Sequence, residues 1–160
     1  MTVTSKSLHK TKAFQLVMDV NLIGTFLCCK YAANALRTLP LQGRERGVII
    51  NVSSVAATEG QRGQLAYSAS KAGVMGMTLP MARDLGRFKI RVVTIAPGVF
   101  DTPILGHASK KFLETLASQA ATGELGTPDD FANMVGGVVS NEYMNGSTIR
   151  LDGGLHLPHL

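Results

Sequence analysis

Residues 50–73 read INVSSVAATEGQRGQLAYSASKAG, and this stretch passes from a strand through a loop into a helix. The strand begins upstream, because residues 47–52 (GVIINV) form a short apolar run of the kind that is buried on both faces of a parallel sheet. Residues 53–64 are small and polar and are predicted to be a loop. Residues 65–86 are predicted to form a long helix, which Pro80 should kink or loosen by one turn.

The alternation of helix and strand continues on both sides of this stretch. Residues 11–38 carry apolar side chains at the three-to-four spacing of a helix face, and residues 89–96 (KIRVVTIA) predict a second buried strand. Residues 103–121 look irregular to helical. A helix is expected from Thr127-Pro128 to about residue 140, and residues 147–151 predict a third strand. This order predicts an α/β fold with a parallel sheet and right-handed crossovers.

The bulk composition fits a single globular domain over residues 1–160. The chain is 45% hydrophobic and 17% charged, which excludes the charge-rich composition of disordered proteins. Its net charge of +5 comes from scattered Lys and Arg residues, so a solvated surface is favoured over nucleic-acid binding, and an anionic nucleotide or acyl-CoA would suit the same charge. Cys28 and Cys29 are predicted to be small core residues in a reducing compartment. No unbroken apolar run approaches the ~18 residues of a membrane span.

Polar and glycine residues follow each predicted strand. Ser53-Ser54 follows the first strand, Pro97-Gly98 the second and Asp152-Gly153 the third. In open α/β sheets, ligands bind beyond the carboxyl ends of the strands, so these three loops are expected to share one functional edge.

Tyr67 and Lys71 lie four residues apart near the start of the predicted helix and therefore share a face. Tyrosine is a poor base at neutral pH, but a nearby ammonium favours the phenolate. Such a pair can donate a proton to a carbonyl oxygen or take one from an alcohol. Taken alone, the spacing favours an ordinary exposed helix pair over a catalytic one.

The surrounding residues resemble the active-site signature of the short-chain dehydrogenase/reductase family. Ser54 precedes Tyr67 by thirteen residues, directly after a buried strand. The resemblance spans roughly residues 12–155 and includes the following further motifs: VNLIGTF at residues 20–26, Ala96-Pro97-Gly98 followed by Thr102, Asn145-Gly146 and LDGG at residues 151–154. It implies that the predicted sheet is the C-terminal part of a Rossmann-like, doubly wound sheet, with three strands and long crossover helices.

The resemblance also implies roles for these residues. Tyr67 would be the proton donor or acceptor, and Lys71 would stabilise its phenolate and bind the nicotinamide ribose. Ser54 would hold the substrate oxygen, with Ser53 as its rival in the sequence. Asn21 would hold a water that connects Lys71 to solvent. The residues implied to contact the cofactor are Tyr67, Lys71, Pro97, Gly98, Val99 and Thr102, of which the last four would line the nicotinamide.

By the same resemblance, the substrate would be a secondary alcohol or ketone, such as a 3-hydroxyacyl-CoA or a hydroxysteroid, and the cofactor NAD, with NADP left open. The implied protein is intracellular and mitochondrial, with the cytoplasm as the alternative. It would form a homo-oligomer through the helices at about residues 11–38 and 65–86, without a membrane partner. The four histidines, His9, His107, His156 and His159, lack metal-ligand spacing and are expected at the surface or in the tail.

The 160 residues contain no glycine-rich G-x-x-x-G-x-G or G-x-G-x-x-G turn. In the family, such a turn brings backbone amides and a helix N-terminus to the cofactor pyrophosphate. The chain is therefore expected to lack the N-terminal nucleotide-binding half. Two interpretations remain open: a dehydrogenase, or a non-catalytic truncated isoform or oligomerisation partner that does not bind NAD(H) tightly.

Overall fold

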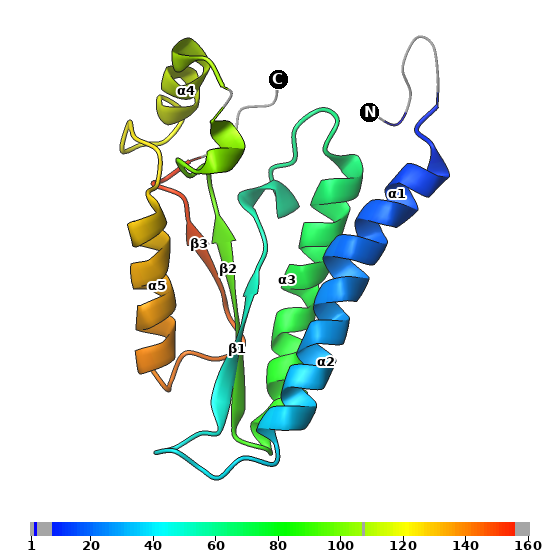
Figure 1. Cartoon of the computed structure of the whole chain (residues 1–160), viewed down its shortest axis with the longest axis vertical. Helices are drawn as coiled ribbons and strands as arrows, with labels where there is room; N and C mark the ends of the chain where they lie inside the picture. Colours follow the sequence, from blue (N-terminus) through cyan, green and yellow to red (C-terminus); the bar gives the residue numbers. More distant parts are fainter. Residues whose placement is uncertain (1, 3–7, 107, 156–160) are drawn as a thin grey trace.

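The structure is a computed structural model that describes residue 2, residues 8–106 and residues 108–155 (Figure 1). His107, His156 and His159 lie outside the described residues. The three strands are β1 (Gly47–Val52), β2 (Ile90–Pro97) and β3 (Thr148–Leu151). The helices are α1 (Thr11–Met18), α2 (Gly24–Leu36), α3 (Leu65–Gly86), α4 (Lys110–Ala117) and α5 (Pro128–Ser140), with one π-helical turn, η1 (Asp19–Ile23), and two 3-10 turns, η2 (Val55–Ala57) and η3 (Pro103–Leu105).

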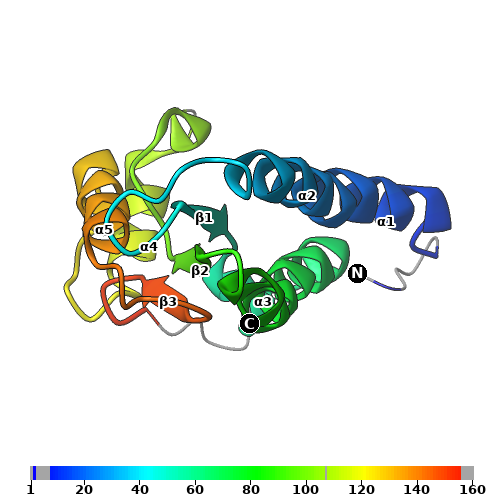
Figure 2. The ribbon, with the colours of Figure 1, turned by 90° about the horizontal axis from the view of Figure 1, so that it is seen from below.

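The three strands form one parallel sheet in the order β1-β2-β3. Gly47 is paired with Ile90 and Thr94 with Thr148, so all three strands run toward the same edge. Figure 2 shows that α2 and α3 cover one face of this sheet and that α5 covers the other. The predicted α/β class with a parallel sheet is therefore confirmed.

Strand β2 is buried on both faces and organises the core. Val92 packs in a cluster with residues of α2 and α3, whereas Val93 and Ile95 pack against α5, which contributes Val138. The polar Thr94 is fully buried, and its hydroxyl shares a hydrogen bond of 2.6 Å with a threonine of α3. Side chains of adjacent β2 residues therefore pack against helices on opposite faces of the sheet, as strand geometry requires.

Strand β1 has the predicted bounds, whereas β2 is shifted by one residue and β3 begins one residue later than predicted. Lys89 was expected in β2, but its φ of 58° places it in the left-handed region, which ends the preceding turn and excludes it from the strand. Pro97 is included instead and is paired with Leu151 of β3. Helix α3 runs through Pro80 without interruption. The helical segment expected within residues 103–121 is confirmed as η3 and α4.

The elements α1, η1 and α2 form a continuous helix from Thr11 to Leu36. Only 6% of its most apolar window is buried, and the mean hydropathy of 1.4 over 18 residues meets the length and composition of a membrane span. Polar residues interrupt this stretch, so it contains no unbroken apolar run, but its apolar residues keep the mean hydropathy high. The predicted core placement is confirmed for Cys29, which is buried, and is wrong for Cys28, which is exposed because adjacent residues of a helix point in different directions.

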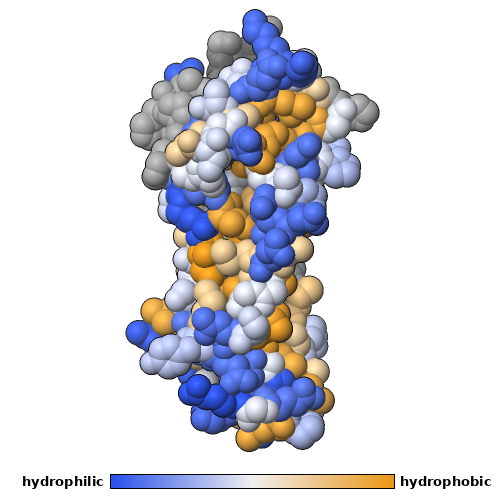
Figure 3. Space-filling model, turned by 90° about the vertical axis from the view of Figure 1, so that its left-hand side faces the viewer, coloured by the Kyte–Doolittle hydropathy of each residue, from blue (hydrophilic) through white to orange (hydrophobic). Residues whose placement is uncertain are grey.

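Helix α5 begins at the predicted cap. The Thr127 hydroxyl accepts a hydrogen bond from the Asp130 amide, and the Asp130 carboxylate accepts one from the Thr127 amide, which completes a capping box. The hydrogen bonds that the Thr127 amide and hydroxyl donate to the Asp130 carboxylate lower the pKa of Asp130. Figure 3 shows the side of the molecule that carries α4 and α5, where hydrophobic residues form a band between hydrophilic ends.

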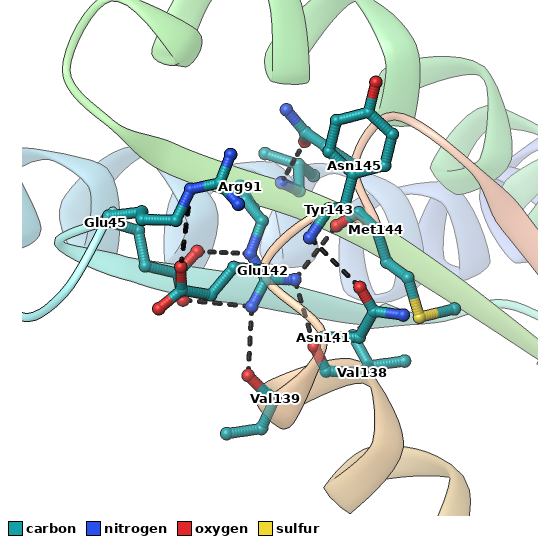
Figure 4. A network of polar contacts seen from close by, with 11 residues as sticks. Glu45, Arg91, Val138, Val139, Asn141, Glu142, Tyr143, Met144 and Asn145 are labelled. Atoms are coloured by element: carbon teal, nitrogen blue, oxygen red, sulfur yellow. Dashed lines mark hydrogen bonds and ion pairs between the residues drawn. The ribbon is translucent and has the colours of Figure 1, made fainter.

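The other end of α5 is held by Arg91 of β2 (Figure 4). The guanidinium of Arg91 donates to the carbonyls of Val138 (3.0 Å), Val139 (3.2 Å) and Met144 (2.9 Å) and forms a two-point ion pair with Glu45. The Arg91 side chain is only 5% exposed. One arginine therefore joins the C-terminus of α5, the turn before β3 and the loop before β1.

Candidate active site

The loops that follow the three strands lie together at the carboxyl edge of the sheet. The Gly98 amide, after β2, donates to the carbonyl of Leu151 in β3 at 2.9 Å. A Cβ at Gly98 would lie 2.8 Å from the Cβ of Asp152, so only glycine allows this approach. The predicted clustering of these loops at one edge is consistent with the parallel strand order and with these contacts.

Ser53 and Ser54 differ in exposure and in hydrogen bonding. The Ser53 side chain is buried, and its hydroxyl donates to the main-chain carbonyl of Lys71 at 2.8 Å. Ser54 is half-buried, and its hydroxyl accepts the Ala56 amide at 3.1 Å. The Ser54 hydroxyl therefore keeps its own proton for another acceptor, whereas the proton of Ser53 is used within the fold. This difference favours Ser54 over Ser53 as the residue that holds a substrate oxygen.

Tyr67 and Lys71 lie on the first two turns of α3, beside the end of β1. The Lys71 Nζ atom lies 5.7 Å from the centre of the Tyr67 ring and donates to the Val52 carbonyl at 3.0 Å. Burial lowers the pKa of the Lys71 ammonium. The Tyr67 side chain remains exposed, at 36% of its surface. The lysine is therefore anchored to the strand end while the tyrosine faces outward.

Asn21 lies in the π-helical turn η1, at the level of α3 that carries Tyr67. Its side-chain amide donates to the Ser70 hydroxyl at 3.1 Å, and that hydroxyl donates to the Tyr67 carbonyl at 2.7 Å. Single π-helical turns within α-helices occur frequently at functional sites. Ser70 was not among the predicted site residues, although its position one turn after Tyr67 places it on the same face of α3.

The residues expected to line the nicotinamide form a second group after β2. Thr102 has extended backbone and precedes η3, and its side chain is half-buried. Val99 lies in the wall of a cavity of about 310 Å³ together with Thr122, Glu124 and Asp152. The resemblance implies that Val99 and Thr102 both contact the nicotinamide. In the structure, Val99 also lines this cavity of about 310 Å³.

No metal site is present among the residues that the structure describes, since they contain no cluster of three or more His, Cys, Asp or Glu side chains. The one described histidine, His9, packs its ring edge-on against Phe14 at 6.3 Å.

Comparison with known proteins places these features in a family. Residues 4–156 match the family model described as Enoyl-(Acyl carrier protein) reductase. The chain belongs to the short-chain dehydrogenase/reductase family. It is 50% identical to human 3-hydroxyacyl-CoA dehydrogenase type-2 over 151 residues, which cover 93% of this chain and 58% of that protein. It is 39% identical to human (3R)-3-hydroxyacyl-CoA dehydrogenase over 143 residues, which cover 88% and 53% of the two chains.

A solved structure shows the same architecture within the short-chain dehydrogenase/reductase family. The crystal structure of 3-hydroxyacyl-CoA dehydrogenase type-2 from Mycobacterium avium superposes with a TM-score of 0.94 at 38% identity. The match covers 98% of this chain and 62% of that one. The Rossmann-like prediction is therefore confirmed, and the chain spans less than two thirds of the length of these relatives.

Proposed function

We propose that this chain carries the catalytic edge of an oxidoreductase that transfers hydride between a nicotinamide cofactor and a secondary alcohol or ketone, such as a 3-hydroxyacyl-CoA or a hydroxysteroid. The observation that carries the proposal is the anchoring of Lys71 beside Tyr67. The Lys71 main-chain carbonyl is held by Ser53, and its ammonium is held by the Val52 carbonyl. Both contacts fix the lysine at the end of β1, two residues before Ser54.

In this proposal, Tyr67 is the general acid or base. In the reductive direction its hydroxyl gives a proton to the substrate carbonyl oxygen, and in the oxidative direction its phenolate takes the alcohol proton. The Lys71 ammonium stabilises the phenolate by its positive charge. The Ser54 hydroxyl, which accepts the Ala56 amide, donates its own proton to the same substrate oxygen and stabilises the negative charge that develops there.

Asn21 is proposed to support proton exchange at Lys71. Its side chain is linked through Ser70 to the backbone of Tyr67, so it is fixed to the turn of α3 that carries the acid–base pair. A water held near Asn21 would restore the proton of Tyr67 through Lys71 between turnovers.

The donor set fits the nicotinamide end of the cofactor, which supplies or accepts the hydride when it is bound. Lys71 offers an ammonium to the ribose hydroxyls, and Thr102 offers a hydroxyl to the carboxamide. Pro97, Gly98 and Val99 would provide the wall beside the ring. The pyrophosphate end has no comparable partner, because the sequence contains no glycine-rich turn of the required spacing. We therefore expect weak cofactor binding by these residues alone.

Titration with NADH and with NADPH, followed by nicotinamide fluorescence, tests cofactor binding. Oxidation of a 3-hydroxyacyl-CoA then tests activity. Replacing Tyr67 with Phe should lower kcat about 10²–10⁴-fold without changing NADH affinity, because only the proton transfer is lost. The matched control is Tyr143→Phe, since Tyr143 is 88% exposed and lies outside both the proposed site and the proposed interface. No fluorescence response at millimolar cofactor, together with no turnover, would refute the proposal for this chain.

The open edge of β1 favours a second function, a non-catalytic oligomerisation partner. Among the described residues, β1 is paired with β2 alone, and Val52 at its end is exposed. A cavity of about 520 Å³ lies between this edge and α2, and the side-chain amide of buried Asn51 in its wall has no hydrogen-bond acceptor among the described residues. Turnover that depends on Tyr67 would exclude this alternative.

Self-association is part of both proposals. The helix from α1 to α2 exposes apolar side chains on successive turns, and α3 beside it exposes Leu79. The large hydrophobic residues that this helix exposes are Leu16, Val20, Ile23, Phe26, Leu27 and Tyr31. Contiguous apolar surface of this kind marks interaction sites, so we propose a homo-oligomer through these helices. Sedimentation analysis of Leu16→Glu against the unchanged chain tests it, and an unaltered mass distribution would contradict it.

A further inference from the structure

One side chain outside the predicted site, Arg150 of β3, contacts two of the loops that form the carboxyl edge. Its guanidinium contacts Glu59 at 2.7 Å and Asp152 at 2.6 Å and donates to the Leu155 carbonyl at 2.8 Å. Glu59 is 91 residues away in the chain, so this ion pair crosses the edge from the loop after β1 to the end of β3.

The contact with Glu59 holds the loop that joins Ser54 to Tyr67. The Glu59 amide donates to the Val55 carbonyl in η2, directly after Ser54. The next residue, Gly60, packs tightly against the start of α3: a Cβ at this position would lie 2.1 Å from the Ser68 hydroxyl oxygen. A displacement of Glu59 would therefore be transmitted both to Ser54 and to the turn of α3 that carries Tyr67.

The contact with Asp152 reaches the loop after β2. Gly98 packs against Asp152, and its amide donates to the carbonyl of Leu151, the residue before Asp152 and the last of β3. A second donor of Arg150, its Nε atom, also bonds Asp152 at 2.8 Å. Arg150 therefore connects the Ser54–Tyr67 loop to the Pro97–Gly98 loop through two carboxylates.

The chemistry of this connection requires arginine. A planar guanidinium presents five donors in a fixed fork, so it can bond two carboxylates and a carbonyl at once, whereas an ammonium acts as a point charge. The side chains of Arg150, Glu59 and Asp152 are 35%, 20% and 11% exposed, so water screens the ion pairs in part. Partly exposed pairs contribute little to global stability, so the contacts chiefly determine how the loops are placed.

We propose that Arg150 is a positioning residue, which holds the Ser54–Tyr67 loop and the Pro97–Gly98 loop in the relative position that hydride transfer needs. The inference rests on the proposed function. Misplacement of reacting groups by about 1 Å can slow an enzyme by about 10²-fold, even when the altered residue touches no reactant.

The test compares Arg150→Gln with Arg150→Lys and with the control Arg44→Gln. Arg44 forms an exposed ion pair with Glu142 at 3.9 Å at the opposite end of the sheet, so its loss should change neither readout. In Arg150→Gln, hydrogen exchange at the amides of residues 55–64 should accelerate about tenfold, while exchange in β1 and β2 stays unchanged. The value of kcat should fall about 10–100-fold with a smaller change in KM, and Arg150→Lys should recover part of the loss.

The two readouts separate this inference from the proposed function. If the unchanged chain neither binds NADH nor turns over substrate, the proposed function fails, and the exchange measurement alone decides whether Arg150 holds the loop. Unchanged exchange at residues 55–64 in Arg150→Gln would overturn the inference. Faster exchange with an unaltered kcat would overturn it as well, because the loop position would then not matter for the reaction.

Discussion

Replacement of Arg91 by methionine should destabilise the fold strongly. Methionine keeps much of the length and apolar volume of the arginine stem but removes every donor. The change leaves the Glu45 carboxylate without its cation and the carbonyls of Val138, Val139 and Met144 without their donor. These carbonyls belong to the C-terminal turn of α5 and the following turn, where the helix itself supplies no partners.

The expected loss of unfolding free energy follows from the burial of the Arg91–Glu45 ion pair. Breaking a buried ion pair by removing one partner costs about 3–5 kcal/mol, because the other charge stays buried. The Arg91 side chain is 5% exposed but that of Glu45 is 16% exposed, so water can reach part of the remaining carboxylate. We therefore expect a loss near the lower limit, about 3 kcal/mol. For a chain of this size each kcal/mol shifts Tm by about 2–4 °C, so Tm should fall by about 6–12 °C.

Urea unfolding monitored by circular dichroism measures the loss, and a double-mutant cycle with Glu45→Gln assigns it to the pair. Glutamine keeps the shape of Glu45 without its charge. Because the double variant leaves no buried charge, its loss should be smaller than the sum of the two single losses by about 1 kcal/mol or more. A loss below about 1 kcal/mol for Arg91→Met, or strictly additive losses, would show that the Arg91–Glu45 pair does not join these segments as described.

Three further outcomes are expected. Gly98→Ala should lower the free energy of unfolding in urea by about 1–3 kcal/mol because the added Cβ meets Asp152. Gly136→Ala, in α5 with open space around it, should raise that free energy by about 0.5–1 kcal/mol. Equal effects of the two variants would contradict the close packing at Gly98. The pKa of Asp130 is lower in the folded than in the unfolded chain, so its ionised carboxylate stabilises the fold above the unfolded pKa. This contribution to the free energy of unfolding is lost as pH falls through the folded pKa. Asp130→Asn should therefore flatten the acid limb of a stability–pH curve. Burial lowers the pKa of Lys71 in the folded chain. Just below the usual lysine pKa of about 10.4 the unfolded chain therefore binds more protons than the folded chain, so the free energy of unfolding should rise with pH there. Lys71→Met should remove this rise.

Local features were predictable because their causes lie within a few residues. The capping box at Thr127 joins residues three apart, and the Tyr67–Lys71 pair lies four apart on one helix, so spacing alone defines both contacts. The largely apolar sequence of β1 indicated a strand of a parallel sheet without any tertiary information.

The choice between neighbouring residues needed the tertiary structure. Ser53 and Ser54 look alike in the sequence, and only the packing of β1 against α3 buries Ser53 and leaves Ser54 half-buried. The same holds for Cys28 and Cys29, which differ because α2 contacts the sheet along one narrow face.

The sequence by itself determined the order of the strands and helices and the family, because these depend on composition and on short motifs, and it predicts Tyr67 and Lys71 as an acid–base pair. Only the tertiary structure decided the partners of the two arginines. Arg91 meets Glu45 from 46 residues away, and Arg150 meets Glu59 from 91 residues away. No periodic pattern records such pairs, since they form only after β1, β2 and β3 have paired and brought distant loops to the two ends of the sheet.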